Sequence, residues 1–275
     1  MDRVPSFVEK SETLPDGPVS YMEAGTGEPV LLLHGIYGHK GHWQALGDLL
    51  TPSYRVIAPD LPLHGRSRSF GPEYATPEAM ARVVHGFTTE LGLGRFHVAG
   101  NSLGGGVAGV LAALYPESVA SLAFLGAPPV RSPIQSEVDQ ARAKGMNLLV
   151  PKTMEEFDRK ISLLFYGAPN VSPERLRKVG VEEIARWSEN TELWKQILVE
   201  FYYLEAYIDR IVAPTLCVWG QEDRLNDISG ADPLKARMKD CKLVVVPKAG
   251  HAVMQEDFRN IAELYLGFLR DHSVS

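Results

Sequence analysis

Short runs of apolar residues alternate along the chain with longer stretches in which apolar and polar positions mix. Each short run is rich in Val, Leu or Ile and stops at Gly or Pro, which is typical of buried parallel strands. Six such runs predict strands at residues 29–35, 54–60, 95–100, 118–126, 214–220 and 242–250. Helical patterns lie at residues 42–50 and 76–92, after Ser102 and at 257–270. The alternation predicts an α/β fold with a mostly parallel central sheet flanked by helices.

This alternation stops between residues 129 and 210, where helix-like patterns dominate and large aromatic residues are frequent. We expect residues 1–128 and 211–275 to form the core and residues 129–210 to form a helical cap inserted between two strands. Some of the aromatic residues serve as the packing core of the cap, and together they are expected to shape an apolar pocket. The aromatic residues are Phe157, Phe165, Tyr166, Trp187, Trp194, Phe201, Tyr202, Tyr203 and Tyr207.

The composition is that of an ordinary globular protein, with 275 residues of which 45% are hydrophobic and 23% charged. The net charge of -6 creates no basic field, so no nucleic-acid partner is expected. The N-terminus is polar and lacks the apolar core of a signal peptide, and no segment approaches the roughly 18 apolar residues that span a bilayer. We therefore expect a cytoplasmic protein. Cys217 and Cys241 lie in apolar strand-like runs and are expected to be buried free thiols.

The sequence GNSLG at residues 100–104 matches the pattern G-x-S-x-G. It follows a predicted strand and opens a predicted helix, the context in which this pattern forms a strained turn that exposes a nucleophilic serine, here Ser102. A side chain two residues before or after the serine would collide with the turn. Gly105 and Gly106 follow and are expected to let the helix pack closely against neighbouring strands. The pattern alone is weak evidence, because a glycine-rich turn with an unimportant serine has the same sequence.

A nucleophilic serine needs a base and an acid that orients the base. Of the eight histidines, His251 follows the last predicted strand directly, where a loop would place it over the carboxyl edge of the sheet. The segment after the preceding strand offers three acids, and we favour Asp223 because it completes a tight G-x-x-D turn. Glu222 would point the other way, and Asp227 is expected to cap the next helix. The order Ser102, Asp223, His251 is that of nucleophile, acid and base in this topology.

An acyl-transfer site also needs N–H donors for the oxyanion. One is expected at Leu103, the residue after the nucleophile, where the first N–H groups of a helix have no intrahelical partner. The second is expected at Ile36, in the loop that begins with His34 and Gly35 at the end of the first predicted strand. Each such donor lowers the barrier by about 2.7–4 kcal/mol. No metal and no organic cofactor is implied.

Taken together, these motifs resemble those of the α/β-hydrolase superfamily over essentially the whole chain, which implies that fold and hydrolase chemistry. The resemblance rests on HG at 34–35, DLPLHGRS at 60–67, GNSLGG at 100–105, GQED at 220–223 and GH at 250–251. The family usually has glycine where Leu63 stands here. Asp60 and Ser67 of the same loop are expected to stabilise it rather than to act on substrate.

Within the superfamily, Asn101 before the serine resembles two groups, the monoacylglycerol-lipase-like esterases and the C–C hydrolases that cleave ring-fission products. In the C–C hydrolases tryptophan usually follows the catalytic histidine, whereas Ala252 follows His251 here, and this departure favours an ester. We therefore expect a serine carboxylic ester hydrolase that cleaves small to medium-chain acyl esters with an apolar acyl or aryl group.

Two alternatives stay open. A C–C hydrolase would use the same triad on a substrate that carries a carboxylate, and it would need an arginine that reaches from the cap. The candidates are Arg131, Arg142, Arg159, Arg175, Arg177 and Arg186. A non-catalytic ligand receptor would keep the hydrolase fold and the triad but would not turn over.

Overall fold

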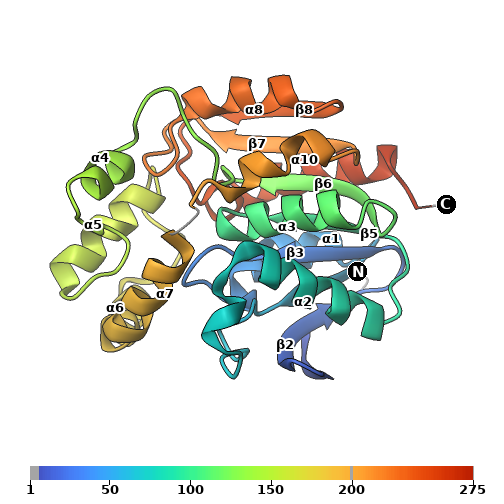
Figure 1. The fold of residues 1–275 in the computed structure, drawn as a ribbon, viewed down its shortest axis with the longest axis horizontal. Helices are drawn as coiled ribbons and strands as arrows, with labels where there is room; N and C mark the ends of the chain where they lie inside the picture. The colour runs from blue at the N-terminus through green and yellow to red at the C-terminus, as the bar shows by residue number, and fades with distance from the viewer. Residues whose placement is uncertain (1–5, 199–200, 275) are drawn as a thin grey trace.

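The computed structural model describes residues 6–198 and 201–274. A central eight-stranded sheet has the order β1-β2-β4-β3-β5-β6-β7-β8 (Figure 1). Neighbouring strands from β4 to β8 in this order are parallel, and β1 and β2 are antiparallel to their neighbours. The predicted α/β fold with a mostly parallel sheet is confirmed. The strands are β1 (Val8–Leu14), β2 (Gly17–Ala24), β3 (Pro29–Leu33), β4 (Arg55–Pro59), β5 (Phe96–Gly100), β6 (Val119–Leu125), β7 (Thr215–Gly220) and β8 (Cys241–Val246).

The six predicted strands correspond to β3 through β8. Five of them are almost completely buried, as their apolar runs predict, because helices cover both faces of the sheet. The expectation of a buried strand is wrong for β8, whose residues are half-buried or exposed. It lies at the edge of the sheet and pairs only with β7, so part of its surface faces solvent.

The hairpin of β1 and β2 was not expected from the sequence. Its outer strand β1 is mostly exposed and carries polar residues, so it has no apolar run. Lys10 of β1 forms an ion pair with Glu23 of β2 at 2.9 Å. The strands are joined by the two-residue turn Pro15–Asp16, and Gly17 is the first residue of β2. The sequence Pro-Asp-Gly between two strand-length segments is the turn signal that could have revealed the hairpin.

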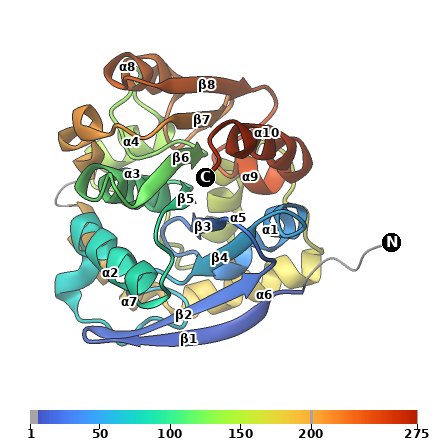
Figure 2. The same ribbon diagram turned by 90° about the vertical axis from the view of Figure 1, so that its right-hand side faces the viewer.

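Helices pack on both faces of the sheet (Figure 2). Buried residues of α1, α9 and α10 form one apolar core with one face, and those of α2, α3 and α8 form another core with the opposite face. The predicted start of α2 is confirmed, since the Thr76 hydroxyl accepts a hydrogen bond from Ala79 N–H at 3.2 Å. These helices are α1 (Gln44–Leu50), α2 (Pro77–Glu90), α3 (Leu103–Leu114), α8 (Ala231–Arg237), α9 (Val253–Glu256) and α10 (Phe258–Asp271).

Residues 129–210 contain helices and, within 129–198 and 201–210, no strand. Figure 1 shows α4 to α7 grouped at the left, to one side of the sheet. Aromatic side chains form part of their packing, because Phe157 is fully buried and Trp194 makes an edge contact with Phe201. The treatment of this segment as a separate cap stays a prediction. Its α-helices are α4 (Glu137–Ala143), α5 (Met154–Leu164), α6 (Pro173–Ala185) and α7 (Trp187–Leu198). Short 3₁₀ helices span Lys40–Trp43, Pro72–Ala75, Tyr203–Ala206, Ile208–Arg210 and Ile228–Gly230.

No helix among the described residues is both long and apolar enough to span a membrane. Residues 1–5 of the polar N-terminal segment, in which we expect no signal peptide, lie outside the described residues. The two cysteines are free thiols, as predicted. Cys217 is buried, whereas Cys241 on the edge strand is only half-buried.

Candidate active site

Ser102 lies in a sharp turn between β5 and α3 and has a left-handed backbone, with φ 53° and ψ -122°. Only glycine fits two residues to either side. A Cβ atom on Gly100 would overlap the backbone of Gly104 and Gly105, and one on Gly104 would overlap carbonyl oxygens at the end of β3. A backbone of this kind costs on the order of 1–3 kcal/mol and is typical of functional sites. The steric explanation for GNSLG is confirmed.

The next two glycines of α3 have different surroundings. Gly105 faces Phe124 of β6, as expected for a helix that packs closely on a strand. The same expectation is wrong for Gly106. A Cβ atom there would overlap the Tyr203 phenol and would lie 2.8 Å from Pro129 Cγ. The Tyr203 hydroxyl donates to the Leu103 carbonyl at 3.2 Å. Because Gly106 has no side chain, Tyr203, near the end of the helical segment 129–210, can pack against the first turn of α3.

Asp223 and His251 form a buried pair, with His251 Nδ1 and Asp223 Oδ2 2.8 Å apart. The other carboxylate oxygen, Oδ1, accepts hydrogen bonds from Leu225 N–H at 2.8 Å and Asn226 N–H at 3.0 Å. A carboxylate can only accept here, so His251 carries its proton on Nδ1 and its lone pair on Nε2. The Nε2 atom is buried and has no hydrogen-bond partner among the described residues. This is the arrangement of an oriented general base.

The neighbouring acids behave as the sequence predicts. Asp223 closes a turn in which its N–H donates to the Gly220 carbonyl at 3.3 Å. The Glu222 carboxylate instead accepts from Ala249 N–H at 3.1 Å. Asp227 caps the 3₁₀ helix Ile228–Gly230 and accepts from Ser229 N–H at 2.9 Å. Of the three candidates, Asp223 makes the hydrogen bond to His251.

Asn101 ties the serine turn to the histidine loop. Its Nδ2 donates to the Leu125 carbonyl at 3.2 Å and to the His251 carbonyl at 3.1 Å. The sequence analysis had used this residue only for the family resemblance. No hydrogen bond between Ser102 Oγ and His251 is found among the described residues. The serine turn and the loop that carries His251 are held together through Asn101, the neighbour of the serine.

The predicted oxyanion loop lies against the serine. A Cβ atom on Gly35 would stand 3.1 Å from Asn101 Oδ1 and 3.3 Å from Ser102 Cβ. Ile36 is half-buried and packs against both the sheet core and the apolar cluster of the helical segment. The N–H groups of Ile36 and Leu103 have no acceptor within residues 6–198 and 201–274. Both proposed donors are therefore free to bind an oxyanion.

The comparison with protein families agrees with this geometry. The sequence profile of the alpha/beta hydrolase fold family matches residues 28–258. The chain belongs to this family.

Relatives of this hydrolase include monoacylglycerol lipase ABHD6 of Rattus norvegicus, which is 31% identical over 252 residues, 87% of this chain and 74% of that protein. The crystal structure of a membrane phospholipase A superposes on this chain with a TM-score of 0.92 and 30% sequence identity. The match covers 98% of this chain and 87% of the phospholipase chain. A 2-hydroxy-6-oxo-6-phenylhexa-2,4-dienoate hydrolase of Burkholderia cepacia is 26% identical over 255 residues, 90% of this chain and 89% of that protein. These similarities identify an enzyme of the lipase-type hydrolase class.

The loop at residues 60–67 of the hydrolase is held by buried polar contacts. Asp60 accepts from Lys40 N–H at 2.7 Å, from the Lys40 ammonium at 2.9 Å and from Arg66 N–H at 2.9 Å. Burial raises the pKa of Asp60, but these donors outweigh it and hold the pKa below its ordinary value. Ser67 Oγ accepts from Ser20 N–H at 2.9 Å. Leu63, in place of the usual glycine, has a left-handed φ of 69°. Asp60 and Ser67 stabilise the loop, as expected.

His34 connects this loop to the oxyanion loop. Its Nε2 accepts from Leu61 N–H at 3.0 Å, which leaves the proton on Nδ1 to be donated to the Gly35 carbonyl at 2.8 Å. Burial lowers the pKa of His34 well below its ordinary value, so the ring is neutral at pH 7. In the sequence analysis His34 served only as part of the HG motif that begins the oxyanion loop, and its link to the loop at residues 60–67 was not foreseen.

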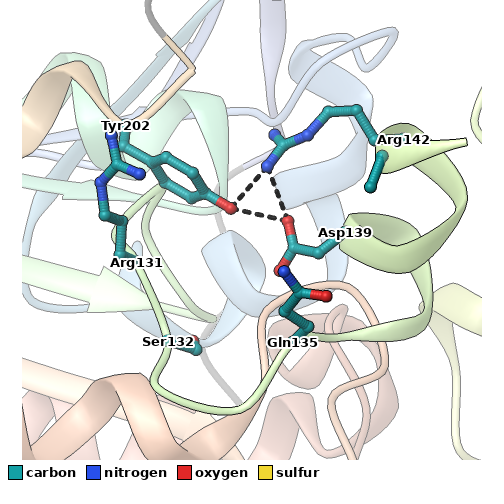
Figure 3. A pocket seen from close by; sticks show the side chains of 7 residues that line it. Arg131, Ser132, Gln135, Asp139, Arg142 and Tyr202 are labelled. Atoms are coloured by element: carbon teal, nitrogen blue, oxygen red, sulfur yellow. Dashed lines mark hydrogen bonds and ion pairs between the residues drawn. The ribbon is translucent and has the colours of Figure 1, made fainter. Parts of the chain in front are cut away.

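A pocket of about 360 Å³ opens in the helical segment (Figure 3). Its wall is polar. Arg142 donates to Asp139 at 2.8 Å and to the Tyr202 hydroxyl at 2.7 Å, and Arg131 pairs with Glu205 at 3.3 Å. This pocket differs from the apolar one expected from the aromatic content, because the guanidinium groups of Arg131 and Arg142 lie over the ring of Tyr202. The lining residues are Arg131, Ser132, Gln135, Asp139, Arg142, Ala143 and Tyr202.

Proposed function

We propose that the protein is a serine carboxylic ester hydrolase that works through an acyl-enzyme, with Ser102 as nucleophile. The observation that carries the proposal is the buried pair of Asp223 and His251, 2.8 Å apart, next to a strained serine turn. Its free histidine nitrogen is the one that a general base needs.

In the proposed reaction Ser102 Oγ attacks the ester carbonyl while His251 Nε2 takes its proton. Asp223 holds the ring in the required tautomer and stabilises the imidazolium that forms. The N–H groups of Leu103 and Ile36 donate to the oxyanion of the tetrahedral intermediate. The intermediate collapses as His251 returns the proton to the leaving alcohol. Water, activated by the same histidine, then hydrolyses the acyl-enzyme.

The proposed substrates are small to medium-chain acyl esters, including monoglycerides. The relatives named as monoacylglycerol lipases support this class. An apolar cluster of the helical segment, which includes Leu149, Leu163 and Trp194, packs against Ile36. Apolar side chains therefore adjoin the proposed oxyanion donor, and an acyl or aryl group would be buried favourably there.

A C–C hydrolase of ring-fission products is the second candidate. The pocket with Arg131 and Arg142 favours it, because such substrates carry a carboxylate that arginine recognises. The Burkholderia cepacia relative is a hydrolase of this kind. Each of these arginines already has an acidic partner, Glu205 and Asp139, which weakens the case for a carboxylate ligand.

A series of p-nitrophenyl esters of increasing chain length tests the proposal on the wild type and on Ser102→Ala. We expect turnover by the wild type, with an optimum at short or medium acyl chains, and its loss in Ser102→Ala. The proposal is wrong if the wild type cleaves no ester or if Ser102→Ala keeps the full rate. Faster cleavage of a ring-fission dienoate than of any ester would favour the C–C hydrolase. Labelling by a fluorophosphonate without ester turnover would favour a receptor.

A further inference from the structure

The peptide between Gly35 and Ile36 is held from its carbonyl side. The Gly35 carbonyl accepts from His34 Nδ1–H at 2.8 Å and from Gly38 N–H at 3.0 Å. In a trans peptide the C=O and the N–H point in opposite directions, and the described residues contain no cis peptide. These two hydrogen bonds therefore also set the direction of Ile36 N–H, the proposed oxyanion donor.

The hydrogen bond from Gly38 to Gly35 closes a turn whose third residue is Tyr37. Tyr37 has a left-handed φ of 59°, in a position where turns of this kind usually have glycine. For a bulky residue this backbone costs about 1–2 kcal/mol. Such a conformation needs stabilising contacts, and the side chain of Tyr37 makes several of them.

Among residues 6–198 and 201–274, the polar contacts of that side chain are with the helical segment. The Tyr37 hydroxyl donates to the Asn190 carbonyl of α7 at 3.2 Å. The Lys160 ammonium of α5 lies 5.1 Å from the centre of the ring and is itself paired with Glu183 of α6. The Tyr37 ring also packs against the apolar cluster of this segment. Helices α5 and α7, distant in sequence from the turn, thus contact its strained residue, and α6 acts on it through the pairing of Glu183 with Lys160.

We propose that Tyr37 is a positioning residue that makes the orientation of Ile36 N–H depend on the packing of α5, α6 and α7. When these helices are in place, Tyr37 is held in its left-handed conformation and the turn presents the donor. When they move away, the strain is no longer offset and the turn that closes on the Gly35 carbonyl is destabilised, which loosens the orientation of the Gly35–Ile36 peptide. This inference rests on the proposed function, since it assigns a task to the oxyanion donor.

The variants Tyr37→Ala and Tyr37→Ser test it. Both residues keep a Cβ, so the left-handed backbone stays strained, but they lose the ring and the phenolic hydroxyl that contact the helical segment. We expect kcat for a p-nitrophenyl ester to fall about 10- to 100-fold with KM changed less than about twofold, because an oxyanion donor acts mainly in the transition state. The rate at which a fluorophosphonate labels Ser102 should fall by a similar factor. Tyr37→Phe keeps the ring and should retain kcat within about threefold.

Tyr207→Phe is the matched control, because the Tyr207 hydroxyl donates to Glu78 of α2 at 2.6 Å and so also joins the helical segment to the core, but through α2 instead of the oxyanion loop. Its kcat and labelling rate should stay at the wild-type level. Wild-type rates in both Tyr37→Ala and Tyr37→Ser, or an equal loss in Tyr207→Phe, would overturn the inference. If the wild type is labelled but cleaves no ester, the proposed function fails while the labelling rates still decide the role of Tyr37. Absence of labelling in the wild type would overturn both.

Discussion

Asn101 and His251 are separated by 150 residues in the sequence, yet the Asn101 side chain donates to the His251 carbonyl at 3.1 Å. The same amide group donates to the Leu125 carbonyl at 3.2 Å, so one side chain joins the serine turn, the end of β6 and the histidine loop. Asn101 is buried, and Gly126 lacks a Cβ that would overlap its amide. The relative position of the proposed nucleophile and its proposed base therefore depends on Asn101.

Replacing Asn101 with alanine should therefore reduce activity more than stability alone explains. Two buried carbonyls lose their donor, which costs about 1–3 kcal/mol of unfolding free energy. A displaced base should lower kcat by about 10- to 100-fold. Steady-state kinetics and urea unfolding of Asn101→Ala measure both effects. The control Thr215→Val removes a buried hydrogen bond to Ala213 at the far end of β7 and should lose stability but keep kcat.

Asp223→Asn should reverse the tautomer of His251. The Oδ1 atom of residue 223 accepts from two backbone N–H groups, which will hold the amide oxygen of asparagine at that position. The amide NH₂ would then face His251 Nδ1 and would force the ring proton onto Nε2, where the base needs a lone pair. We expect kcat to fall on the order of 10³–10⁴-fold. Glu222→Gln, which changes the neighbouring acid, should keep kcat, and comparable losses in both variants would contradict the assignment.

The buried His64 should make the protein less stable in acid. Its Nδ1 donates to the Pro62 carbonyl at 2.9 Å, and burial lowers its pKa from 6.5 to about 4. Below pH 6.5 this residue is protonated in the unfolded chain, whereas in the folded chain it stays neutral until the pH falls to about 4. The contribution to stability is therefore complete above pH 6.5 and is lost as the pH falls, by about 2 kcal/mol at pH 5.

Urea unfolding at pH 7 and pH 5 checks this expectation with the variant His64→Asn, whose amide can still donate to Pro62. The variant should lose about 2 kcal/mol less than the wild type between the two pH values. His272→Asn, in the C-terminal tail, should behave like the wild type. An identical pH dependence for the wild type and His64→Asn would show that His64 is not the group responsible.

Alanine substitutions at Gly86 of α2 and at Gly104 of the serine turn should change the free energy of unfolding in opposite directions. Gly86 lies in the interior of α2 with no atom within 4 Å of the position of a Cβ, so Gly86→Ala should stabilise the protein by about 0.5–1 kcal/mol. Gly104→Ala would push a methyl group into the carbonyls of Leu33 and His34 and should destabilise it by more than 3 kcal/mol, roughly the scale of a severe core substitution. Thermal unfolding of the two variants tests this opposition. Equal shifts would mean that the turn can relax.

Features that depend on local sterics or on buried apolar runs were predictable. Helices cover both faces of the central strands, so β3 to β7 have continuous apolar sequences that stand out. The hairpin of β1 and β2 was not predicted, because an exposed edge strand does not need a continuous apolar sequence. The pairing of Asp223 with His251 could be inferred because both follow parallel strands whose carboxyl ends meet at one edge.

The sequence by itself determined the serine turn through its G-x-S-x-G pattern, and Gly100 is required by the backbone of Gly104 and Gly105, only a few residues away. Only the tertiary structure decided that Gly106 makes room for Tyr203, that Asn101 bonds the His251 loop, and that α5 and α7 hold Tyr37. The physical reason is the sequence distance over which each interaction acts. A steric limit on φ involves only neighbouring residues. The partner of a buried side chain depends on how distant elements pack, and a local sequence pattern does not contain that information.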